Sequence, residues 1–452
     1  MPRKRGTSMS KSPGNSRFRV KDKTQDEGSK ETRGSLWNNV ALAIGVLVVS
    51  ASIPIILGLL DKTQKTTIID PKKLPATAQV IDQKSFNVLQ HVPPPKEANA
   101  TTRFLWPGVT YESLTKQPFH VYDAEFLDII GNDPTLTLVA TSITDPIFHE
   151  AVVWSPGTEE VFFAQNAGDP AAGTGLEKSS VVQKISLSDA EAVKNGTHIS
   201  EEVEVKIVDE TPQVINPNGG TNYKGQIIFA GEGQGDNIPS ALYLMNPRSP
   251  HNTTILVNNY FGRQFNSIND VSVNPRNGDI YFTDTMYGYW QYFRPLPGLQ
   301  NQVYRFNPET GALTVVADGF VAPNGLTFSP DGQHAYVTDT GISNALFGLN
   351  FTRPASIYRF DAQKDGTWEN RKTFAYVAAR LPDGIHCDSK GNVYAGCGDG
   401  VHVWNPSGKL IGKIYTGVNA ANFQFAGKGR MVIMGRTKLF YATLAASGAP
   451  LS

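Results

Sequence analysis

The segment NGLTFSPDGQHAYVTDT, residues 324–340, contains a polar opening, an alternating apolar run, a Pro-Asp-Gly turn and a second apolar run. This order is typical of a β-hairpin, because Val, Phe, Tyr and Thr favour strands whereas Pro, Asp and Gly favour turns. Five other segments repeat the pattern, the last two more weakly: EAVVWSPGTEEVFFAQ (150–165), NDVSVNPRNGDIYFTDT (269–285), DGIHCDSKGNVYAGCGDG (383–400), NGGTNYKGQIIFAGEG (218–233) and ANFQFAGKGRMVIMGR (421–436). The chain therefore contains six copies of one unit.

The spacing of the copies, about 40 to 70 residues, leaves room for two further strands in each unit. QVYRFNP (302–308) and SIYRFDA (356–362) are examples of such strands. Four-stranded units repeated in a chain without a long amphipathic helix are typical of propeller blades. The sequence therefore predicts an all-β, six-bladed β-propeller over residues 101–452, since seven blades or a β-sandwich would not explain six aligned starts.

The last unit has one strand too few, because only KLFYATL (438–444) follows its hairpin. FHVYDAEFLDIIG (119–131), which precedes the first unit, can supply the missing strand. Pairing both ends of the chain in one blade would leave no open sheet edge in the ring. We therefore expect residues 119–131 to close the propeller.

The N-terminal hundred residues differ from the rest in composition. Residues 1–36 are rich in Ser and Gly, and the first 33 hold ten basic side chains against four acidic ones, which predicts a disordered basic tail. Residues 37–60 carry no charge, and ALAIGVLVVSASIPIILGLL (41–60) is long enough to cross a bilayer as a helix. Residues 61–100, which contain DPKKLPATAQ and HVPPPKEANA, are typical of an extended stalk.

The apolar segment has two interpretations, an uncleaved transmembrane anchor or a cleaved signal peptide. Its length and its long leader favour the anchor, and the basic residues that precede it favour a cytoplasmic N-terminus. We therefore expect a single-pass type II membrane protein whose propeller is lumenal or extracellular. Four N-glycosylation sequons follow the anchor and agree with this topology, at Asn99, Asn195, Asn252 and Asn350.

Overall charge and cysteine content exclude some classes of protein. The chain holds 41 Lys and Arg against 41 Asp and Glu, so no net field favours a nucleic-acid partner. Cys387 and Cys397 are too few for a disulfide framework. They form either one bridge or two buried thiols in one hairpin, and the second arrangement is favoured.

The first residue of each hairpin is an acid or an amide. We call these the opening residues: Glu150, Asn218, Asn269, Asn324, Asp383 and, one residue into its copy, Asn422. The inner strands of a propeller surround a channel, so the opening residues should meet at one mouth of it. Their hard oxygen atoms suit Ca²⁺ or another divalent cation. Turn formation is the alternative explanation for Asn and Asp, but Glu150 has no preference for turns.

Four motifs around the opening residues resemble the senescence-marker-protein/gluconolactonase family, and within it the fungal lactonohydrolases. They are HEAVVW (149–154), FNSINDVSV (265–273), PNGLTFSPDG (323–332) and PDGIHCDSKGNVY (382–394). NNYFGRQFNSIND (258–270) and DTMYGYWQYFRPLPGLQNQVYRF (284–306) strengthen the likeness, which extends over residues 100 to 445. The resemblance implies a six-bladed propeller with one divalent metal, commonly Ca²⁺, that hydrolyses lactones of sugar acids or related esters.

The resemblance also implies roles for individual residues. Glu150, Asn324 and Asp383 correspond to the metal ligands of the family, and Asn269 to its further contact with metal or substrate. Many animal members carry an Arg where this chain has Ser267, so Arg263 is the candidate substitute for binding substrate.

The remaining site predictions follow from position along the strands. We expect Asp383 to act as the general base and Asn218 to contact substrate. Tyr287 lies in a loop after an inner hairpin, where it either walls the pocket or packs between blades. Successive side chains on a strand point to opposite faces, so we expect His149 to be a packing or supporting residue and His386 to face away.

Two other classes of function fit the same fold. A propeller like strictosidine synthase would not require the complete set of oxygen ligands, and a propeller that only binds partners would need no catalytic base. The presence of Glu150 with Asn324 and Asp383 favours the hydrolase. Loss of activity in a chelator and rescue by Ca²⁺ would separate the hydrolase from both alternatives.

Overall fold

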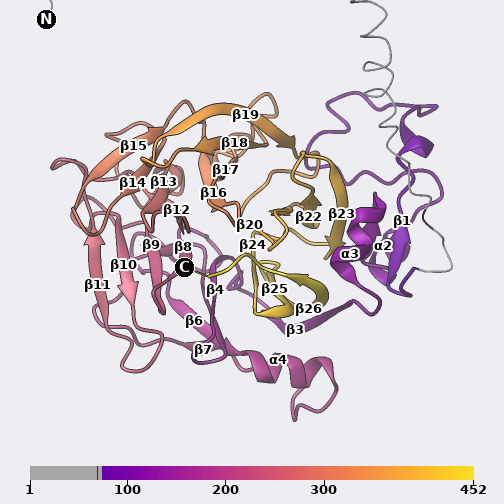
Figure 1. Ribbon diagram of the computed structural model, residues 1–452, viewed down its shortest axis with the longest axis horizontal. Coiled ribbons are helices and arrows are strands. Elements are labelled where there is room, and N and C mark those ends of the chain that lie inside the picture. Colours follow the sequence, from indigo (N-terminus) through magenta and orange to yellow (C-terminus); the bar gives the residue numbers. More distant parts are fainter. Residues whose placement is uncertain (1–68, 70–73, 452) are drawn as a thin grey trace, which may run out of the picture. The chain divides into compact units, whose positions relative to one another are not determined.

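A computed structural model describes residues 69 and 74–451, and Figure 1 shows their six sheets arranged as a ring. Blade 1 contains β4 (Glu150–Ser155), β5 (Glu160–Ala164), β6 (Val182–Ser186) and β7 (Lys206–Ile207). Blade 2 contains β8 (Pro217–Tyr223), β9 (Gln226–Gly231), β10 (Ala241–Met245) and β11 (Thr253–Val257). Blade 3 contains β12 (Ile268–Val273), β13 (Ile280–Asp284), β14 (Gln302–Phe306) and β15 (Leu313–Ala317).

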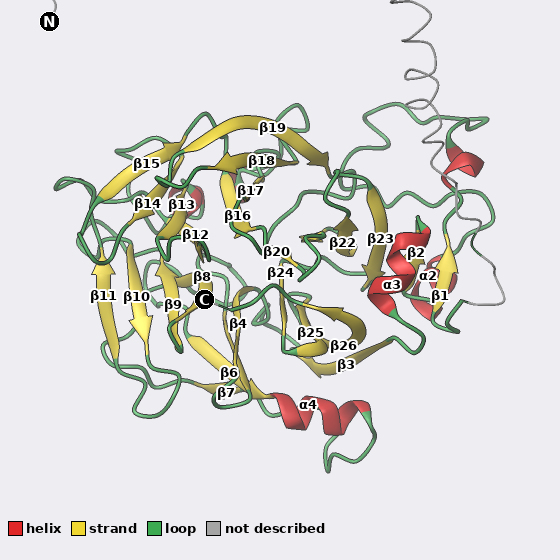
Figure 2. Cartoon of the chain, viewed as in Figure 1, coloured by secondary structure: helices red, strands yellow, loops and turns green. Residues whose placement is uncertain are grey.

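The second half of the ring has the same antiparallel organisation (Figure 2). Blade 4 contains β16 (Pro323–Phe328), β17 (His334–Asp339), β18 (Ser356–Ala362) and β19 (Trp368–Tyr376). Blade 5 contains β20 (Ile385–Cys387), β21 (Val393–Cys397), β22 (Gly400–Trp404) and β23 (Leu410–Tyr415). Blade 6 contains β24 (Asn422–Phe425), β25 (Lys428–Met434), β26 (Lys438–Ser447) and β3 (Thr135–Thr141). The all-β, six-bladed propeller predicted from the repeat is confirmed.

The two ends of the propeller do pair in one blade, but the predicted closing segment was wrong. β3 pairs antiparallel with β26, with Thr141 opposite Lys438 and Thr135 opposite Thr443. The expected segment, residues 119–131, contributes only a short strand, β2 (Phe119–Val121), which pairs with β23 in blade 5. After β2 the chain turns into short helices η3 (Ala124–Phe126) and α3 (Leu127–Ile130), so it cannot continue as a strand.

Blade 5 is extended outward by residues that were expected to form a stalk. β1 (Ala78–Val80) pairs in parallel with β2, and Ala78 and Ile81 are both buried. The described part of residues 61–100 therefore contributes to the folded unit. The remaining short helices are η2 (Gln83–Phe86), α2 (Tyr111–Lys116), α4 (Leu187–Lys194), α5 (Tyr287–Trp290) and η4 (Ala345–Phe347).

The repeat places aromatic side chains in the contacts between blades. Tyr281 on β13 is fully buried, and its ring lies 5.0 Å from Phe328 and 5.5 Å from Trp368 of blade 4. Tyr394 occupies the matching position on β21 and lies 5.1 Å from Phe425 of blade 6. Large aromatic surfaces removed from water at each junction stabilise the ring.

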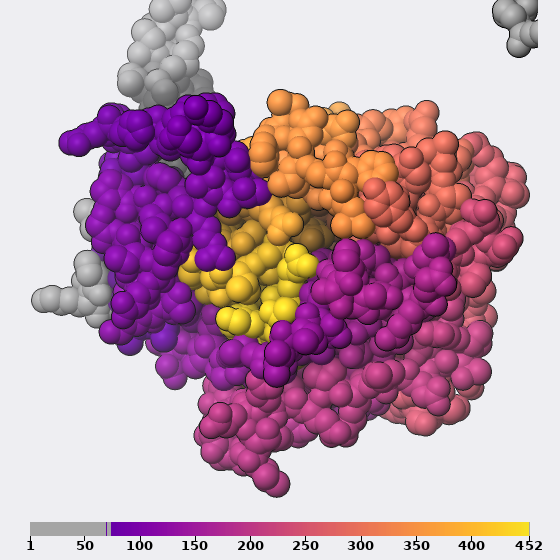
Figure 3. Space-filling model, turned by 180° about the vertical axis from the view of Figure 1, so that it is seen from behind, coloured from indigo at the N-terminus to yellow at the C-terminus, as the bar shows by residue number. Residues whose placement is uncertain are grey.

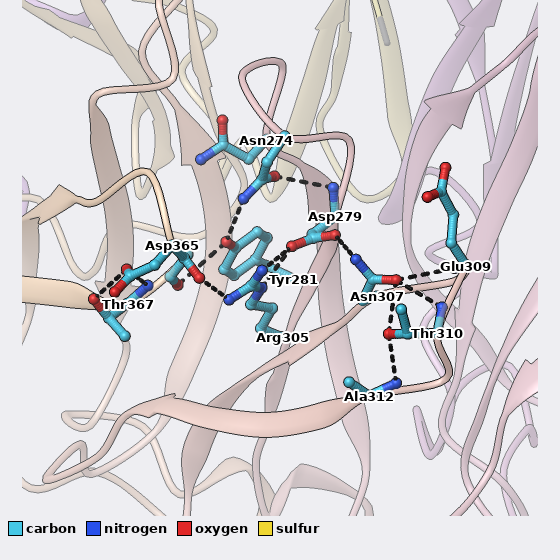
Figure 4. Close-up of polar contacts among 12 residues, drawn as sticks. Asn274, Asp279, Tyr281, Arg305, Asn307, Glu309, Thr310, Ala312, Asp365 and Thr367 are labelled. Carbon is cyan, nitrogen blue, oxygen red and sulfur yellow. Dashed lines mark hydrogen bonds and ion pairs between the residues drawn. The ribbon is translucent and has the colours of Figure 1, made fainter.

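A polar network also joins blade 3 to blade 4 (Figure 4). The Asp279 carboxylate accepts hydrogen bonds from Arg305 Nε at 2.5 Å and from Asn307 Nδ2 at 2.7 Å. Arg305 Nη1 donates to the carbonyl of Asp365, and Tyr281 donates its hydroxyl proton to the carbonyl of Gly366 at 3.3 Å. The network therefore fixes the β18–β19 turn of blade 4 to the hairpin of blade 3.

Replacing Asp279 by Ala is expected to lower the free energy of unfolding by about 2–4 kcal/mol. Asp279 is 1% exposed, so its removal leaves the Arg305 guanidinium partly buried without its carboxylate partner. Urea unfolding followed by circular dichroism measures the change. Asp365→Ala is the matched control, since the Asp365 side chain bonds only Thr367 within its own turn and should cost less than about 1 kcal/mol. Equal losses in both variants would contradict the prediction.

Several predictions concern residues or features outside the propeller core. The tail (1–36) and the anchor (37–60) lie outside the described residues, and within residues 69 and 74–451 no helix is long and apolar enough to cross a membrane. Cys387 and Cys397 are both buried and free, which confirms the favoured arrangement. The four sequon asparagines are at least partly accessible, at Asn99, Asn195, Asn252 and Asn350.

Candidate functional site

A β-bulge opens the inner strand of each of the first four blades. The pairing register shifts just after Glu150 in β4, after Pro217 in β8, after Ile268 in β12 and after Pro323 in β16. A bulge bends the strand and changes the direction of a side chain, which breaks the simple alternation of the strand. In these four blades the repeat therefore encodes a change of direction near the opening residue as well as a strand.

The residue after the opening residue is often glycine because neighbouring inner strands approach closely there. A Cβ on Gly219 would lie 2.4 Å from the carbonyl oxygen of Asn269, and one on Gly325 would lie 2.3 Å from that of Asp383. Ala151 takes this position in blade 1 with a φ of 53°. Small residues at this position thus let the strands converge and bring the opening residues together.

Five of the six opening residues line one cavity of about 450 Å³, at Glu150, Asn218, Asn269, Asn324 and Asp383. Tyr287 from α5 also lines it, and its hydroxyl lies 2.5 Å from Thr340 Oγ1. Figure 3 shows the face of the molecule opposite to that of Figure 1, hollowed at its centre between the indigo N-terminal segment and the orange loops. The structure therefore brings together six of the seven predicted site residues.

Arg263 is the predicted site residue that the structure does not bring to this cavity. Its backbone pairs with Tyr260 in an isolated bridge, and its guanidinium donates to the carbonyl of Gly298. Its side chain is exposed on the loop between β11 and β12. The role in substrate binding expected for Arg263 therefore has no support from its position.

The sixth opening residue, Asn422, faces a different space. It lines a second cavity of about 380 Å³ together with Asp270 and His386. His386 faces away from the first cavity as expected, and its ring packs edge-on against Phe423 at 5.1 Å. Burial lowers the pKa of His386 to about 4, so it is neutral at physiological pH.

Two side-chain oxygen atoms of residues that line the first cavity lack a hydrogen-bond partner. Asn269 Oδ1 and Asp383 Oδ1 are buried without a hydrogen-bond partner. Burial, together with the nearby carboxylate of Glu150, raises the pKa of Asp383 to about 7. Burial and the charge of Asp270 raise the pKa of Glu150 well above its ordinary value. Two desolvated carboxylates and an unpaired amide oxygen are the features that a bound cation would satisfy.

The donor set therefore fits a hard divalent cation held by Glu150, Asn269, Asn324 and Asp383. Within the residues that the structure describes, no group of three or more His, Cys, Asp or Glu side chains could hold a metal ion, so amide oxygens would have to complete a site here. The donor atoms are the oxygens of two carboxylates and two side-chain amides. Such hard oxygen ligands suit Ca²⁺ better than softer metals. Asn218 is fixed beside it, because its Nδ2 donates to the carbonyl of Asn269 at 3.0 Å.

His149 supports the site from behind Glu150. Its Nδ1 lies 2.7 Å from Glu150 Oε1, and it lines the same cavity. Burial lowers the pKa of His149 to about 4, so the neutral ring can donate its Nδ1 proton to the carboxylate. This arrangement agrees with the expected supporting role and orients one oxygen of Glu150.

Two arginines that the sequence analysis missed complete the wall of the cavity. Arg380 and Arg436 line it, and both adopt left-handed backbone angles, with φ of 68° and 65°. Arg436 Nη2 donates to Asp169 Oδ2 at 3.0 Å, and the charge of Arg380 acts on both His149 and Asp383. Backbone strain of this kind concentrates at functional sites. Arg380 lies outside the six repeat copies, and Arg436 is the last residue of the copy at 421–436, where no matching residue in the other copies marks it.

Comparison with known proteins finds similarity to the SMP-30/gluconolactonase family. The family model for the SMP-30/gluconolactonase/LRE-like region matches residues 219–434. The chain is 29% identical over 345 residues to lactonohydrolase oryL of Aspergillus oryzae, covering 71% of this chain and 72% of that one. It is 26% identical over 390 residues to lactonohydrolase oryH of the same organism, covering 71% and 78%.

Solved structures agree with the fold. A gluconolactonase from Xanthomonas campestris superposes with a TM-score of 0.56 and 25% identity, covering 72% of this chain and 95% of that chain. A second structure, of a putative gluconolactonase, superposes with a TM-score of 0.58 at 23% identity, covering 74% and 99%.

Proposed function

Since the resemblance to the SMP-30/gluconolactonase family is confirmed over residues 219–434, we propose that this chain is a lactonase-type hydrolase that depends on a divalent cation, most simply Ca²⁺. Its substrate would be a lactone or a related ester. One observation carries the proposal. Asn269 and Asp383 line one cavity together with Glu150 and Asn324, and each of the two has a buried oxygen atom without a hydrogen-bond partner.

When bound, the cation would polarise the carbonyl of the lactone and stabilise the negative charge that forms on its oxygen. Asp383 would act as the general base and take a proton from water as the water oxygen attacks the carbonyl carbon. The ring C–O bond then breaks, and the Asp383 carboxyl returns the proton to the departing alkoxide. Lactone and water thus become a hydroxy acid with no other reactant.

The remaining cavity residues would position the substrate. Tyr287 is held by Thr340, and Asn218 by the backbone of Asn269, so both present fixed polar groups. Arg436 is already paired with Asp169, which leaves Arg380 as the cation best placed to attract the carboxylate product. Fixed donors of this kind lower the entropy lost when the substrate is oriented.

The test is hydrolysis by the full-length chain of a panel of aldonolactones, alkyl lactones and aryl esters, with EDTA and with added Ca²⁺. We expect turnover that EDTA abolishes and Ca²⁺ restores. A folded protein that hydrolyses none of these compounds with any divalent metal would overturn the proposal and favour a propeller that only binds partners.

Affinity for Ca²⁺ is expected to rise about 10- to 100-fold between pH 6 and pH 8. The pKa of Asp383 in the metal-free protein is about 7 and that of Glu150 is also raised, so at pH 6 protons compete with the cation for these oxygens. Each proton released on binding contributes up to about tenfold per pH unit below the pKa. Isothermal titration calorimetry in buffers of different ionisation enthalpy measures affinity and proton release. A flat profile would contradict the prediction.

We also propose that residues 37–60 anchor the chain in a membrane with the propeller on the lumenal or extracellular side. The uncharged run of residues 41–60 and the accessible sequons at Asn99, Asn195, Asn252 and Asn350 support this topology. Glycosidase treatment of the protein from a eukaryotic host, combined with protease protection of sealed microsomes, tests it. Glycan-free protein that alkaline carbonate extracts from membranes would refute the topology.

A further inference from the structure

A third cavity, of about 500 Å³, adjoins the candidate active site. The two cavities share three lining residues, Leu349, Arg380 and Asn419. The walls of the third cavity are mostly aromatic and aliphatic, and include Phe86, Phe104, Trp106, Tyr111, Leu114 and Tyr415. We call this space the side chamber. Its lining contrasts with the amides, carboxylates and arginines of the first cavity.

The N-terminal segment 83–111 builds one wall of the side chamber and blade 5 builds the other. Phe86 contacts Phe104 and Trp106, with ring centroids 5.5 and 5.8 Å apart. The carbonyl of Ala100 accepts a hydrogen bond of 2.6 Å from the backbone N–H of Arg380. This bond fixes the N-terminal segment to a residue of the active-site wall. The indigo segment accordingly borders the hollow in Figure 3.

The charges at the floor of the side chamber are paired with one another. Lys413 Nζ lies 3.2 Å from Asp399 Oδ2, and His402 Nε2 lies 2.6 Å from Asp399 Oδ1. Although burial opposes ionisation, the Lys413 charge holds the pKa of Asp399 well below its ordinary value. The floor is therefore close to neutral, and the chamber offers mainly apolar contact area.

We propose that the side chamber binds an apolar arm of the substrate, so that the preferred substrate is a lactone or ester with an alkyl or aryl substituent. This inference rests on the proposed function, because the shared residues Arg380 and Asn419 join the chamber to the reacting site. Phe104, Tyr111 and Leu349 line the chamber although they are 51%, 47% and 45% exposed. Exposed apolar surface beside a polar reaction site is suited to a ligand that has a polar reacting group and an apolar substituent. A polyhydroxylated aldonolactone would leave this surface uncovered.

The first test compares kcat/KM for δ-valerolactone and δ-dodecalactone with Ca²⁺ present. Each methylene that enters the chamber should raise kcat/KM about two- to fourfold, until the chamber is filled. Phe104→Ala should lower kcat/KM for δ-dodecalactone about tenfold and leave that for δ-valerolactone unchanged. Phe261→Ala is the matched control, because Phe261 is 85% exposed and lies outside both cavities.

A binding measurement separates this inference from the proposed function. Equilibrium dialysis of δ-dodecalactone against the full-length chain in EDTA measures occupancy of the side chamber when hydrolysis is blocked. Weaker binding to Phe104→Ala than to Phe261→Ala supports the inference even if no lactone is hydrolysed in Ca²⁺. Hydrolysis with no dependence on chain length, or equal binding to both variants, overturns the inference and leaves the lactonase proposal standing.

Discussion

Replacing Asp383 by Asn is expected to lower kcat/KM for lactone hydrolysis at least about 10³-fold while the propeller stays folded. Asn keeps an oxygen that can bind a cation but cannot accept a proton from water. Asp383 is also buried with one unpartnered oxygen, so the isosteric change leaves the packing of its surroundings intact. The measurement is kcat/KM with saturating Ca²⁺, alongside Ca²⁺ affinity by calorimetry.

Two comparisons make this result specific to Asp383. Asp331→Asn is the matched control, since Asp331 bonds Ser329 and Gln333 in the β16–β17 turn of blade 4, outside the candidate active-site cavity, and should change activity less than about twofold. Calcium affinity of Asp383→Asn should fall, but saturating Ca²⁺ should not restore activity. If excess Ca²⁺ restores wild-type turnover, Asp383 is only a ligand and another group is the base.

Local pattern was sufficient to predict the blades and most of the site. Each hairpin is a contiguous stretch of sequence, so its strands, its turn and its opening residue all appear in one window, as in residues 324–340. Equivalent positions on five of the six inner strands then meet because the blades form a ring, whereas Asn422 of blade 6 lines the second cavity. Glu150, Asn269 and Asp383 line one cavity, as their matching positions in the repeat predicted.

The closing strand was not predictable from the same kind of pattern. Both Phe119–Val121 and Thr135–Thr141 read as strands, and the choice depends on which one reaches the edge of β26. That choice is made by the short helices between them and by the packing of Phe126, which is fully buried against blade 5. Such long-range pairing leaves no trace in a single window of sequence.

The arginines and the side chamber were missed for a related reason. Arg380 lies outside the six repeat copies, and Arg436 ends the copy at 421–436 without a matching Arg in the other five, so the repeat pattern marks neither residue. Prolines in residues 61–100 suggested a stalk, yet Phe86 and Ala100 pack beside the propeller. The N-terminal wall of the side chamber therefore comes from a segment outside the repeat, where only the structure shows which residues meet.

Replacing Glu150 by Gln is expected to stabilise the metal-free protein and destabilise the Ca²⁺ complex. In the metal-free protein, burial raises the pKa of both Glu150 and Asp383, and the charge of Glu150 contributes to the raised pKa of Asp383. Both folded pKa values lie above those of the unfolded chain, so this part of the stability is present at low pH and is lost as pH rises, for Asp383 through a folded pKa of about 7. Gln removes one charge, which should raise the free energy of unfolding in EDTA by about 1–3 kcal/mol at pH 8.

The same charge is what binds the cation, so Glu150→Gln should weaken Ca²⁺ binding about 10²- to 10³-fold. Urea unfolding at pH 8, in EDTA and in Ca²⁺, measures both effects in one experiment. Glu210→Gln is the matched control, because burial also raises the pKa of Glu210, but it lies outside the candidate active-site cavity. That variant should change stability equally with and without Ca²⁺. If Glu150→Gln behaves like the control, the paired carboxylates do not form a cation site. If its effect changes sign between EDTA and Ca²⁺, Glu150 is retained for binding at the expense of stability.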